Sequence, residues 1–99
     1  MIGRLIICKS RDKDKPDAGE IVSIYLLEEF WDKGYGRQMM DYAIGELKHM
    51  GCHEIVVWVL EKNKRARRFY EKCGFVPDGA KKEINVDTPL IEMRYAINV

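Results

Sequence analysis

The feature that most limits the fold is a short apolar segment in the second half of the chain. Residues 55–60 read IVVWVL and consist only of aliphatic and aromatic residues. A continuous apolar run of this length is typical of a parallel strand buried on both faces, because a strand with one wet face alternates apolar and polar residues. The segment therefore predicts a strand in the interior of a sheet.

Helical patterns lie on both sides of this strand. From Arg37 onward, apolar residues recur at the spacing of one helix face, and Gly51 suits the C-cap of that helix. After the strand, Asn63 can serve as an N-cap for a second apolar stripe that ends at Gly74. The stripe consists of Ala66, Phe69, Tyr70 and Cys73. The sequence therefore predicts two helices packed on the sheet.

Four further segments have the β-branched or apolar composition of strands. They span residues 4–9, 20–27, 81–86 and 90–97, with a charged loop at 10–19 and a turn at 87–89. The element order β-β-α-β-α-β-β predicts an α/β (α+β) fold with a mixed central sheet. The middle strand–helix–strand unit should cross over right-handed and make its two strands parallel, while the last two strands form an antiparallel hairpin. At 99 residues, a single domain is expected.

Composition and charge argue against several classes of protein. Seventeen basic and sixteen acidic residues give a net charge of +1, which does not suit a general nucleic-acid binder. No apolar run approaches the ~18 residues that span a bilayer, so no membrane partner is expected. The chain start lacks the pattern of a secretion signal, and three cysteines without a CxxC pair predict reduced thiols and a cytoplasmic location. His49 and His53 have no partners at metal-ligand spacing, so no metal site is expected.

Two glycines, Gly34 and Gly36, directly precede the first predicted helix. A glycine-rich loop at a helix start presents unpaired N–H groups and the positive end of the helix dipole, which favours phosphate. Lys33 and Arg37 flank the loop and add positive charge. The alternative is a simple turn, in which the two glycines only permit the backbone conformation and bind no ligand. A dinucleotide-binding fingerprint would need a third glycine where Met39 stands, and no P-loop string occurs.

Two blocks of sequence together resemble one known family. Residues 20–36 read EIVSIYLLEEFWDKGYG, which is similar to the family's E-I-x-x-I-Y strand followed by a (Q/R)-x-x-G-x-(G/A) loop. Residues 56–75 read VVWVLEKNKRARRFYEKCGF and contain the second family pattern, N-x-x-A-x-x-F-Y-x-x-x-G-F. Both blocks occur in the family's order. From its first predicted strand to its last, the chain resembles the C-terminal two-thirds of an acetyltransferase of the GNAT superfamily.

The resemblance implies an acyl-CoA N-acyltransferase-like fold, with acetyl coenzyme A (acetyl-CoA) as cofactor. The strand at 20–27 would separate from the strand at 55–60 at its C-terminal end. Backbone groups exposed there would pair with the pantetheine arm; they belong to Ile24, Tyr25 and Leu26. The pyrophosphate would lie on N–H groups of Gly34, Tyr35, Gly36, Arg37 and Gln38, with Lys33 beside them. The implied activity is transfer of the acetyl group to a primary amine that attacks the thioester directly.

The resemblance also implies roles for side chains. Tyr70 is the expected general acid at the leaving sulfur; the alternative is a core position on an apolar helix face. Glu20 is the expected base, with a pKa raised by an apolar cleft; the alternative is a solvent-facing strand end. Asn63 would cap its helix and touch the pantetheine. The other positions expected at the cofactor are Arg65 or Arg68 at the 3′-phosphate, Ala66, and Phe69, which would pack beside the cofactor or in the core.

The glycine loop departs from the family pattern at two positions. Trp31 stands where family members carry Gln or Arg, and Asp32 stands where Gly is common. A carboxylate pointing inward would repel a pyrophosphate, so Asp32 is expected to face solvent. The backbone around the glycines is kept, and cofactor binding is expected to survive both changes.

The N-terminal part of the family pattern is missing. Familiar members place a strand and two helices before the position of Met1, and those helices shape the acceptor site. Without them the first predicted strand has an open edge, so a homodimer is expected, formed by pairing or exchange of that strand. The alternative function is a non-catalytic module that binds coenzyme A or only dimerises.

Overall fold

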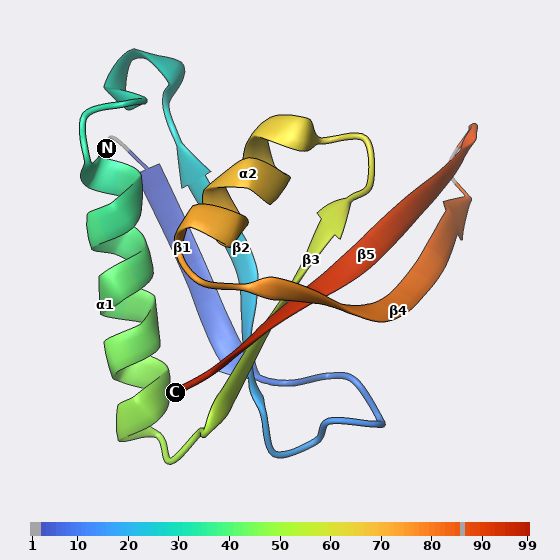
Figure 1. The fold of residues 1–99 in the computed structure, drawn as a ribbon, viewed down its shortest axis with the longest axis horizontal. Helices are drawn as coiled ribbons and strands as arrows, with labels where there is room; N and C mark the ends of the chain where they lie inside the picture. The colour runs from blue at the N-terminus through green and yellow to red at the C-terminus, as the bar shows by residue number, and fades with distance from the viewer. Residues whose placement is uncertain (1–2, 86) are drawn as a thin grey trace.

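The structure is a computed structural model that describes residues 3–85 and 87–99. Within these ranges, five strands and two helices follow one another in the predicted order (Figure 1). The strands are β1 (Gly3–Lys9), β2 (Gly19–Leu26), β3 (Glu54–Leu60), β4 (Val76–Asn85) and β5 (Pro89–Asn98). The helices are α1 (Tyr35–His49) and α2 (Lys64–Lys72), and a 3-10 turn, η1 (Glu28–Phe30), precedes α1.

The strands form one mixed sheet in the spatial order β1-β2-β3-β5-β4. β2 and β3 run parallel, as the strand–helix–strand unit predicts, and the other neighbouring pairs are antiparallel. β3 carries the apolar run of the sequence and pairs with β5 from Glu54 to Leu60. Its residues Ile55, Val56 and Val57 are buried. The predicted central strand, mixed sheet and C-terminal hairpin are thereby confirmed.

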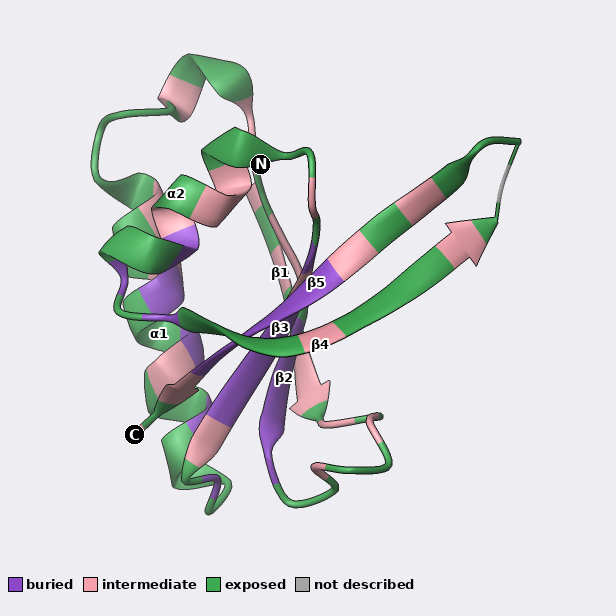
Figure 2. Cartoon of the chain, turned by 45° about the vertical axis from the view of Figure 1, so that its right-hand side comes forward, coloured by how far each residue is buried: buried purple, intermediate pink, exposed green. Residues whose placement is uncertain are grey.

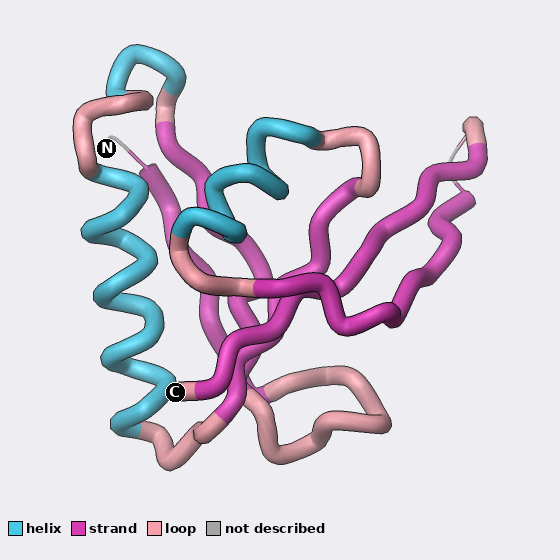
Figure 3. Tube along the Cα trace, in the orientation of Figure 1, coloured by secondary structure: helices cyan, strands magenta, loops and turns pink. Residues whose placement is uncertain are grey.

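β2 and β3 separate toward their C-terminal ends. In the described part of the chain, their pairing ends where Ile21 lies opposite Val57. Beyond that point β2 continues along β1 as far as Leu26, and β3 continues along β5 as far as Leu60. In the ribbon and tube views, α2 crosses in front of the gap between the two strands (Figure 1 and Figure 3). The divergence expected at this end of the sheet is confirmed.

β4 begins at Val76 rather than at the predicted Lys81. Pro77 and Gly79 are atypical of a strand interior, because proline lacks an N–H donor and glycine weakens a strand. The strand includes both residues in an irregular stretch, where its register against β5 shifts between Pro77 and Lys81 and Gly79 has a φ of 93°. The predicted end of this strand, Val86, lies outside the described residues.

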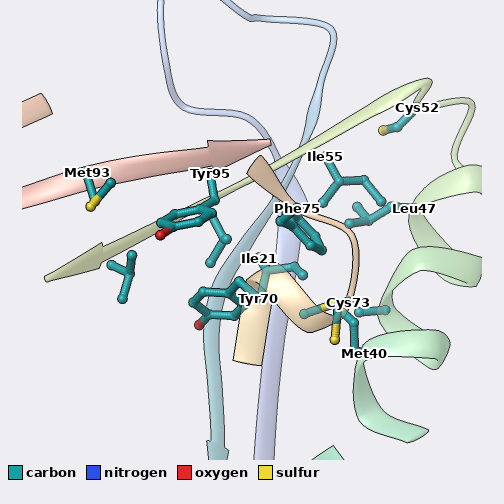
Figure 4. Close-up of a cluster of buried hydrophobic side chains, with 13 residues drawn as sticks. Ile21, Met40, Leu47, Cys52, Ile55, Tyr70, Cys73, Phe75, Met93 and Tyr95 are labelled. Atoms are coloured by element: carbon teal, nitrogen blue, oxygen red, sulfur yellow. The ribbon is translucent and has the colours of Figure 1, made fainter. Parts of the chain in front are cut away.

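Both helices pack on the same face of the sheet and enclose the main core. Figure 4 shows its side chains converging from the helices and the strands. The largest fully buried apolar side chains are Tyr95, Phe75, Ile21, Met40, Leu47 and Ile55. Gly19 allows α1 to approach β2 closely, because a Cβ there would lie 2.8 Å from Cδ2 of Leu47. The described helices include none that is both long enough and apolar enough to cross a bilayer.

The loop between β1 and β2 covers the opposite face of the sheet, and Arg94 of β5 fastens it there. The Arg94 side chain is buried, with 4% exposure, and its guanidinium donates to Asp12 at 3.1 Å, to Asp14 at 2.7 Å and to Asp78 at 2.6 Å. Trp58 of β3 is half-buried, and its Nε1 donates to Asp12 at 2.9 Å. The distal part of the β4–β5 hairpin extends away from this contact and is largely exposed (Figure 2).

Candidate active site

The glycine loop forms the start of α1. Gly34 is the N-cap, with a φ of 85° that glycine adopts without strain. The helix begins at Tyr35, two residues before the predicted helical pattern, because the apolar stripe starts only at Met39. N–H groups in a first helical turn have no partner within the helix, so those of Tyr35, Gly36 and Arg37 point out of its end. The N–H of Gln38, also predicted to bind phosphate, donates instead to the Gly34 carbonyl at 3.1 Å.

The first turn of α1 lies against the C-terminal half of α2, where Arg37 donates a hydrogen bond to the Lys72 carbonyl at 3.3 Å. A Cβ on Gly36 would lie 3.2 Å from Cε1 of Phe69, so the absence of a side chain at Gly36 leaves room for the Phe69 ring. Asn63 caps α2 as predicted, because its Oδ1 accepts a hydrogen bond from the N–H of Ala66 at 3.1 Å. Ala66 and Phe69 are both half-buried and pack against the main core.

The C-terminal part of β2 has an open edge on the side toward β3. Ile24, Tyr25 and Leu26 pair with β1, and the described residues provide no strand partner for them on the other side. The Leu26 carbonyl accepts a hydrogen bond from Nε1 of Trp31 at 2.8 Å. The structure therefore brings the three predicted pantetheine residues together with the start of α1, and it adds Trp31 as a contact of the strand end.

Tyr70 lies on the inner face of α2, within an aromatic cluster. Its side chain is 6% exposed, and its ring centroid lies 5.7 Å from that of Phe69, 6.1 Å from Phe75 and 6.2 Å from Tyr95. Burial raises the pKa of Tyr70 to about 12, so the phenol keeps its proton at neutral pH. Figure 4 shows the hydroxyl directed away from Cys73. The ring is therefore part of the core, as the alternative interpretation held, while the hydroxyl remains an available donor.

A second phenol beside Tyr70 has both hydrogen-bonding functions occupied. The Tyr95 hydroxyl accepts from Nε of Arg67 at 3.1 Å and donates to Oε2 of Glu71 at 2.7 Å. Arg67 also donates to the Glu61 carbonyl at 2.9 Å, and so joins α2 to the residue after β3 and to β5. Tyr95 was not identifiable from the sequence, because a tyrosine in a strand carries no motif of its own.

Glu20 lies at the start of β2, far from the open edge. Its side chain is 2% exposed, so the interpretation as a solvent-facing strand end is wrong. Its carboxylate accepts three hydrogen bonds from Arg11, at 3.0 Å from the backbone N–H, 3.4 Å from Nε and 2.7 Å from Nη2. Four residues of strand place Glu20 about 13 Å from Ile24. The side chain therefore has an arginine partner in place of the apolar surroundings expected for it.

The loop departures at Trp31 and Asp32 contact Arg65 in the first turn of α2. The Arg65 guanidinium lies 3.9 Å from the Trp31 ring centroid, and its Nη2 lies 3.5 Å from Oδ2 of Asp32. Asp32 faces solvent as predicted, with a side chain 89% exposed. Lys33, just before α1, and Arg68, in the middle of α2, are both exposed. Across residues 3–85 and 87–99, no three His, Cys, Asp or Glu side chains are grouped to hold a metal ion.

Known proteins match the sequence patterns described above. The model of the family described as "Acetyltransferase (GNAT) family" matches residues 1–75. The protein named "Uncharacterized N-acetyltransferase YvbK" of Bacillus subtilis (strain 168) is 33% identical over 63 residues, which are 64% of this chain and 41% of that protein. Glucosamine 6-phosphate N-acetyltransferase of Arabidopsis thaliana is 29% identical over 72 residues, 73% of this chain and 46% of that protein. The chain thus spans less than half the length of these two curated relatives.

Solved structures share the fold. An acetyltransferase from Bacillus anthracis str. Ames in complex with acetyl coenzyme A matches with a TM-score of 0.85 and 21% identity, over 99% of this chain and 56% of that one. A Bacillus subtilis acetyltransferase in complex with CoA matches with a TM-score of 0.80 and 23% identity, over 100% of this chain and 70% of that one. The family model, which matches most of the sequence, shows that the chain belongs to the GNAT acetyltransferase family.

Proposed function

We propose that this chain is an N-acetyltransferase domain, which binds acetyl-CoA and transfers the acetyl group to a primary amine by direct attack in a ternary complex. The observation that carries the proposal is the divergence of β2 and β3 beside the start of α1. The names of the relatives, and the acetyl-CoA and CoA bound in solved structures of the same fold, support it. The acceptor is an amine on a peptide or on a small molecule.

The residues around the divergence fit the successive parts of acetyl-CoA. The N–H groups of Tyr35, Gly36 and Arg37, at the positive end of the α1 dipole, suit a pyrophosphate. The open edge of β2 offers peptide N–H and C=O groups, which the amides of a pantetheine arm can satisfy. The half-buried side chain of Phe69 lies beside the first turn of α1 and offers apolar surface.

The chemistry needs orientation and stabilisation of charge rather than an enzyme nucleophile. Acetyl-CoA would supply the activated thioester. A backbone N–H on the β2 edge, for which Ile24 is the candidate, would donate a hydrogen bond to the carbonyl oxygen as that oxygen gains negative charge. As the C–N bond forms and the C–S bond breaks, Tyr70 would donate a hydrogen bond to the sulfur that takes the electron pair. A phenol with a pKa of about 12 is a weaker acid than an ordinary thiol near 8.5, so Tyr70 keeps its proton and acts as a donor.

Glu20 remains our candidate for accepting the amine proton. Because it lies about 13 Å along β2 from Ile24, the proton would reach it through ordered water. A Glu20→Gln variant is expected to react more slowly near neutral pH, where most of an amine carries its proton. An unchanged rate would assign that deprotonation to the solvent.

Thiol release separates an enzyme from a binding module. With acetyl-CoA and a panel of peptide, polyamine and small-molecule amines, at least one amine should accelerate release of the free thiol above the rate without protein. Binding of acetyl-CoA without accelerated release for any amine would favour the alternative, a non-catalytic coenzyme A-binding or dimerisation module. Absence of binding would contradict the proposal itself.

We also propose that the chain forms a homodimer through the open edge of β1. β1 is the outermost strand on its side of the sheet, and Ile6 in it is 44% exposed. Beside it, between β1 and α1, lies a groove of about 390 Å³ whose lining includes Leu5, Met39 and Tyr42. Light scattering at micromolar concentration should give the mass of two chains, and the mass of one chain would contradict the dimer.

The remaining proposals concern location and extent. The cysteines, Cys8, Cys52 and Cys73, are all free thiols, which is the state expected of a cytoplasmic protein. Burial raises the pKa of the Cys73 thiol, so that residue is unsuited to act as a nucleophile. We propose a cytoplasmic location and a single domain for the chain.

A further inference from the structure

The Trp31 ring provides a flat surface on which the Arg65 side chain stacks, beside the proposed cofactor site. The indole Nε1 donates to the Leu26 carbonyl at 2.8 Å, which ties the ring to the end of β2. The Arg65 guanidinium lies over that ring, 3.9 Å from its centroid. A guanidinium that stacks on an aromatic face keeps its N–H donors free at the edge of the plane. Trp31 therefore holds a cation between the end of β2 and the start of α2, with donors available for an anion.

Asp32 supplies the anion that Arg65 contacts in this structure. Its Oδ2 lies 3.5 Å from Nη2 of Arg65, which is too long for a strong charge-assisted hydrogen bond. Both side chains are well exposed, at 89% for Asp32 and 54% for Arg65, and exposed ion pairs of this kind contribute little to stability. The Asp32 backbone also has a φ of 61°, a left-handed conformation that disfavours residues other than glycine, asparagine and aspartate. The contact is therefore easily opened.

From these contacts we propose that the Asp32 carboxylate competes with phosphate for Arg65. It pairs with the Arg65 guanidinium until a phosphate group of the bound ligand displaces it. The inference rests on the proposed function, because the phosphate belongs to acetyl-CoA. A phosphate offers more negative charge and more acceptor oxygens than one carboxylate, and Arg65 can bind it in a bidentate way without leaving Trp31. Trp31 is thus a positioning residue for Arg65, and Asp32 lowers the affinity for phosphate-bearing ligands.

Calorimetric titration of the full chain and of Asp32→Asn tests the proposal. Asparagine tolerates the same backbone conformation and keeps the size of the side chain, so the variant removes charge alone. Asp32→Asn is expected to lower the Kd for acetyl-CoA by about two- to fivefold, the range of a lost exposed ion pair. The Kd for S-acetylpantetheine, which has no phosphate, should not change. The gain should shrink as the salt concentration rises.

Two further titrations identify why Asp32→Asn binds acetyl-CoA more tightly. In an Arg65→Gln background, Asp32→Asn should change the Kd for acetyl-CoA by less than about twofold, because the double-mutant cycle removes the shared partner. Acetyl-3′-dephospho-CoA separates the phosphates: loss of the gain assigns the displacing group to the 3′-phosphate, and retention assigns it to the pyrophosphate. Either assignment supports displacement.

Binding of acetyl-CoA by the wild-type protein distinguishes failure of the competitor role from failure of the proposed function. If wild-type protein binds acetyl-CoA and Asp32→Asn leaves the Kd unchanged, or improves it equally in the Arg65→Gln background, the competitor role is refuted while the function stands. If wild-type protein does not bind acetyl-CoA, both are refuted.

Discussion

Replacement of Tyr70 by phenylalanine is expected to slow thiol release by about 10²-fold, with little change in the Kd for acetyl-CoA. The size follows from the loss of one donor aimed at developing negative charge. The ring, which packs among Phe69, Phe75 and Tyr95, is retained, so the core should stay intact. Because the substitution keeps the ring and its packing, the melting temperature should stay nearly unchanged. Single-turnover rates and equilibrium titration measure the two quantities separately.

Tyr95→Phe is the matched control in the same aromatic cluster. Its hydroxyl is bound by Arg67 and Glu71, so its removal should cost about 1 kcal/mol of stability while the chemical step is affected much less than in Tyr70→Phe. Because burial holds the pKa of Tyr70 at about 12, the wild-type rate should show no loss of this donor between pH 7 and about 10. Equal single-turnover rates for wild type and Tyr70→Phe would remove Tyr70 from the mechanism.

Replacement of Arg94 by methionine is expected to lower the free energy of unfolding by about 3–5 kcal/mol, because it leaves carboxylates without their buried partner. Arg94 contacts three of them, and two, Asp12 and Asp78, have side chains only 16% exposed. The contacts join the loop between β1 and β2 to both strands of the C-terminal hairpin. Urea denaturation measures the loss. Lys81→Met is the control on the same hairpin: it breaks only the exposed pair with Glu61 and should cost less than about 1 kcal/mol.

The same cluster predicts how stability falls in acid. The hydrogen bond from Arg94 lowers the pKa of Asp14 from 3.8 to about 2 in the folded protein. The unfolded chain therefore binds the proton first, so this contribution is complete above pH 3.8 and is lost as the pH falls toward 2. Arg94→Met should flatten this part of the stability profile. A profile that is unchanged in the variant, or a variant as stable as Lys81→Met, would contradict the role given to Arg94.

Features that depend on local pattern were predictable from the sequence. The apolar run at 55–60 and the two helical stripes gave the element order, and the connection through α1 makes β2 and β3 parallel. Asn63 was identifiable as a cap because N-capping needs only a side-chain oxygen at the right offset. The divergence of β2 and β3 was predictable only from the GNAT-like motifs, because it produces no periodic pattern of apolar residues.

Features that depend on distant contacts were not predictable. Arg94 meets Asp12 and Asp14 across about eighty positions of sequence, and no spacing rule connects them. The start of β4 was missed because Pro77 and Gly79 usually mark loops, whereas here they lie in an irregular stretch of the strand. Trp31 was visible only as a departure from the family's loop, and its bond to the Leu26 carbonyl comes from the fold.

Amide chemical shifts during titration with acetyl-CoA report on each backbone N–H separately and so locate the bound cofactor on the fold. The largest shifts should occur at two places, Ile24 to Leu26 on the open edge of β2 and Gly34 to Arg37 at the start of α1. Amides at the paired start of β2, such as Ile21, serve as the internal control and should shift little. No shifts at saturating acetyl-CoA, or shifts confined to the groove between β1 and α1, would contradict the account.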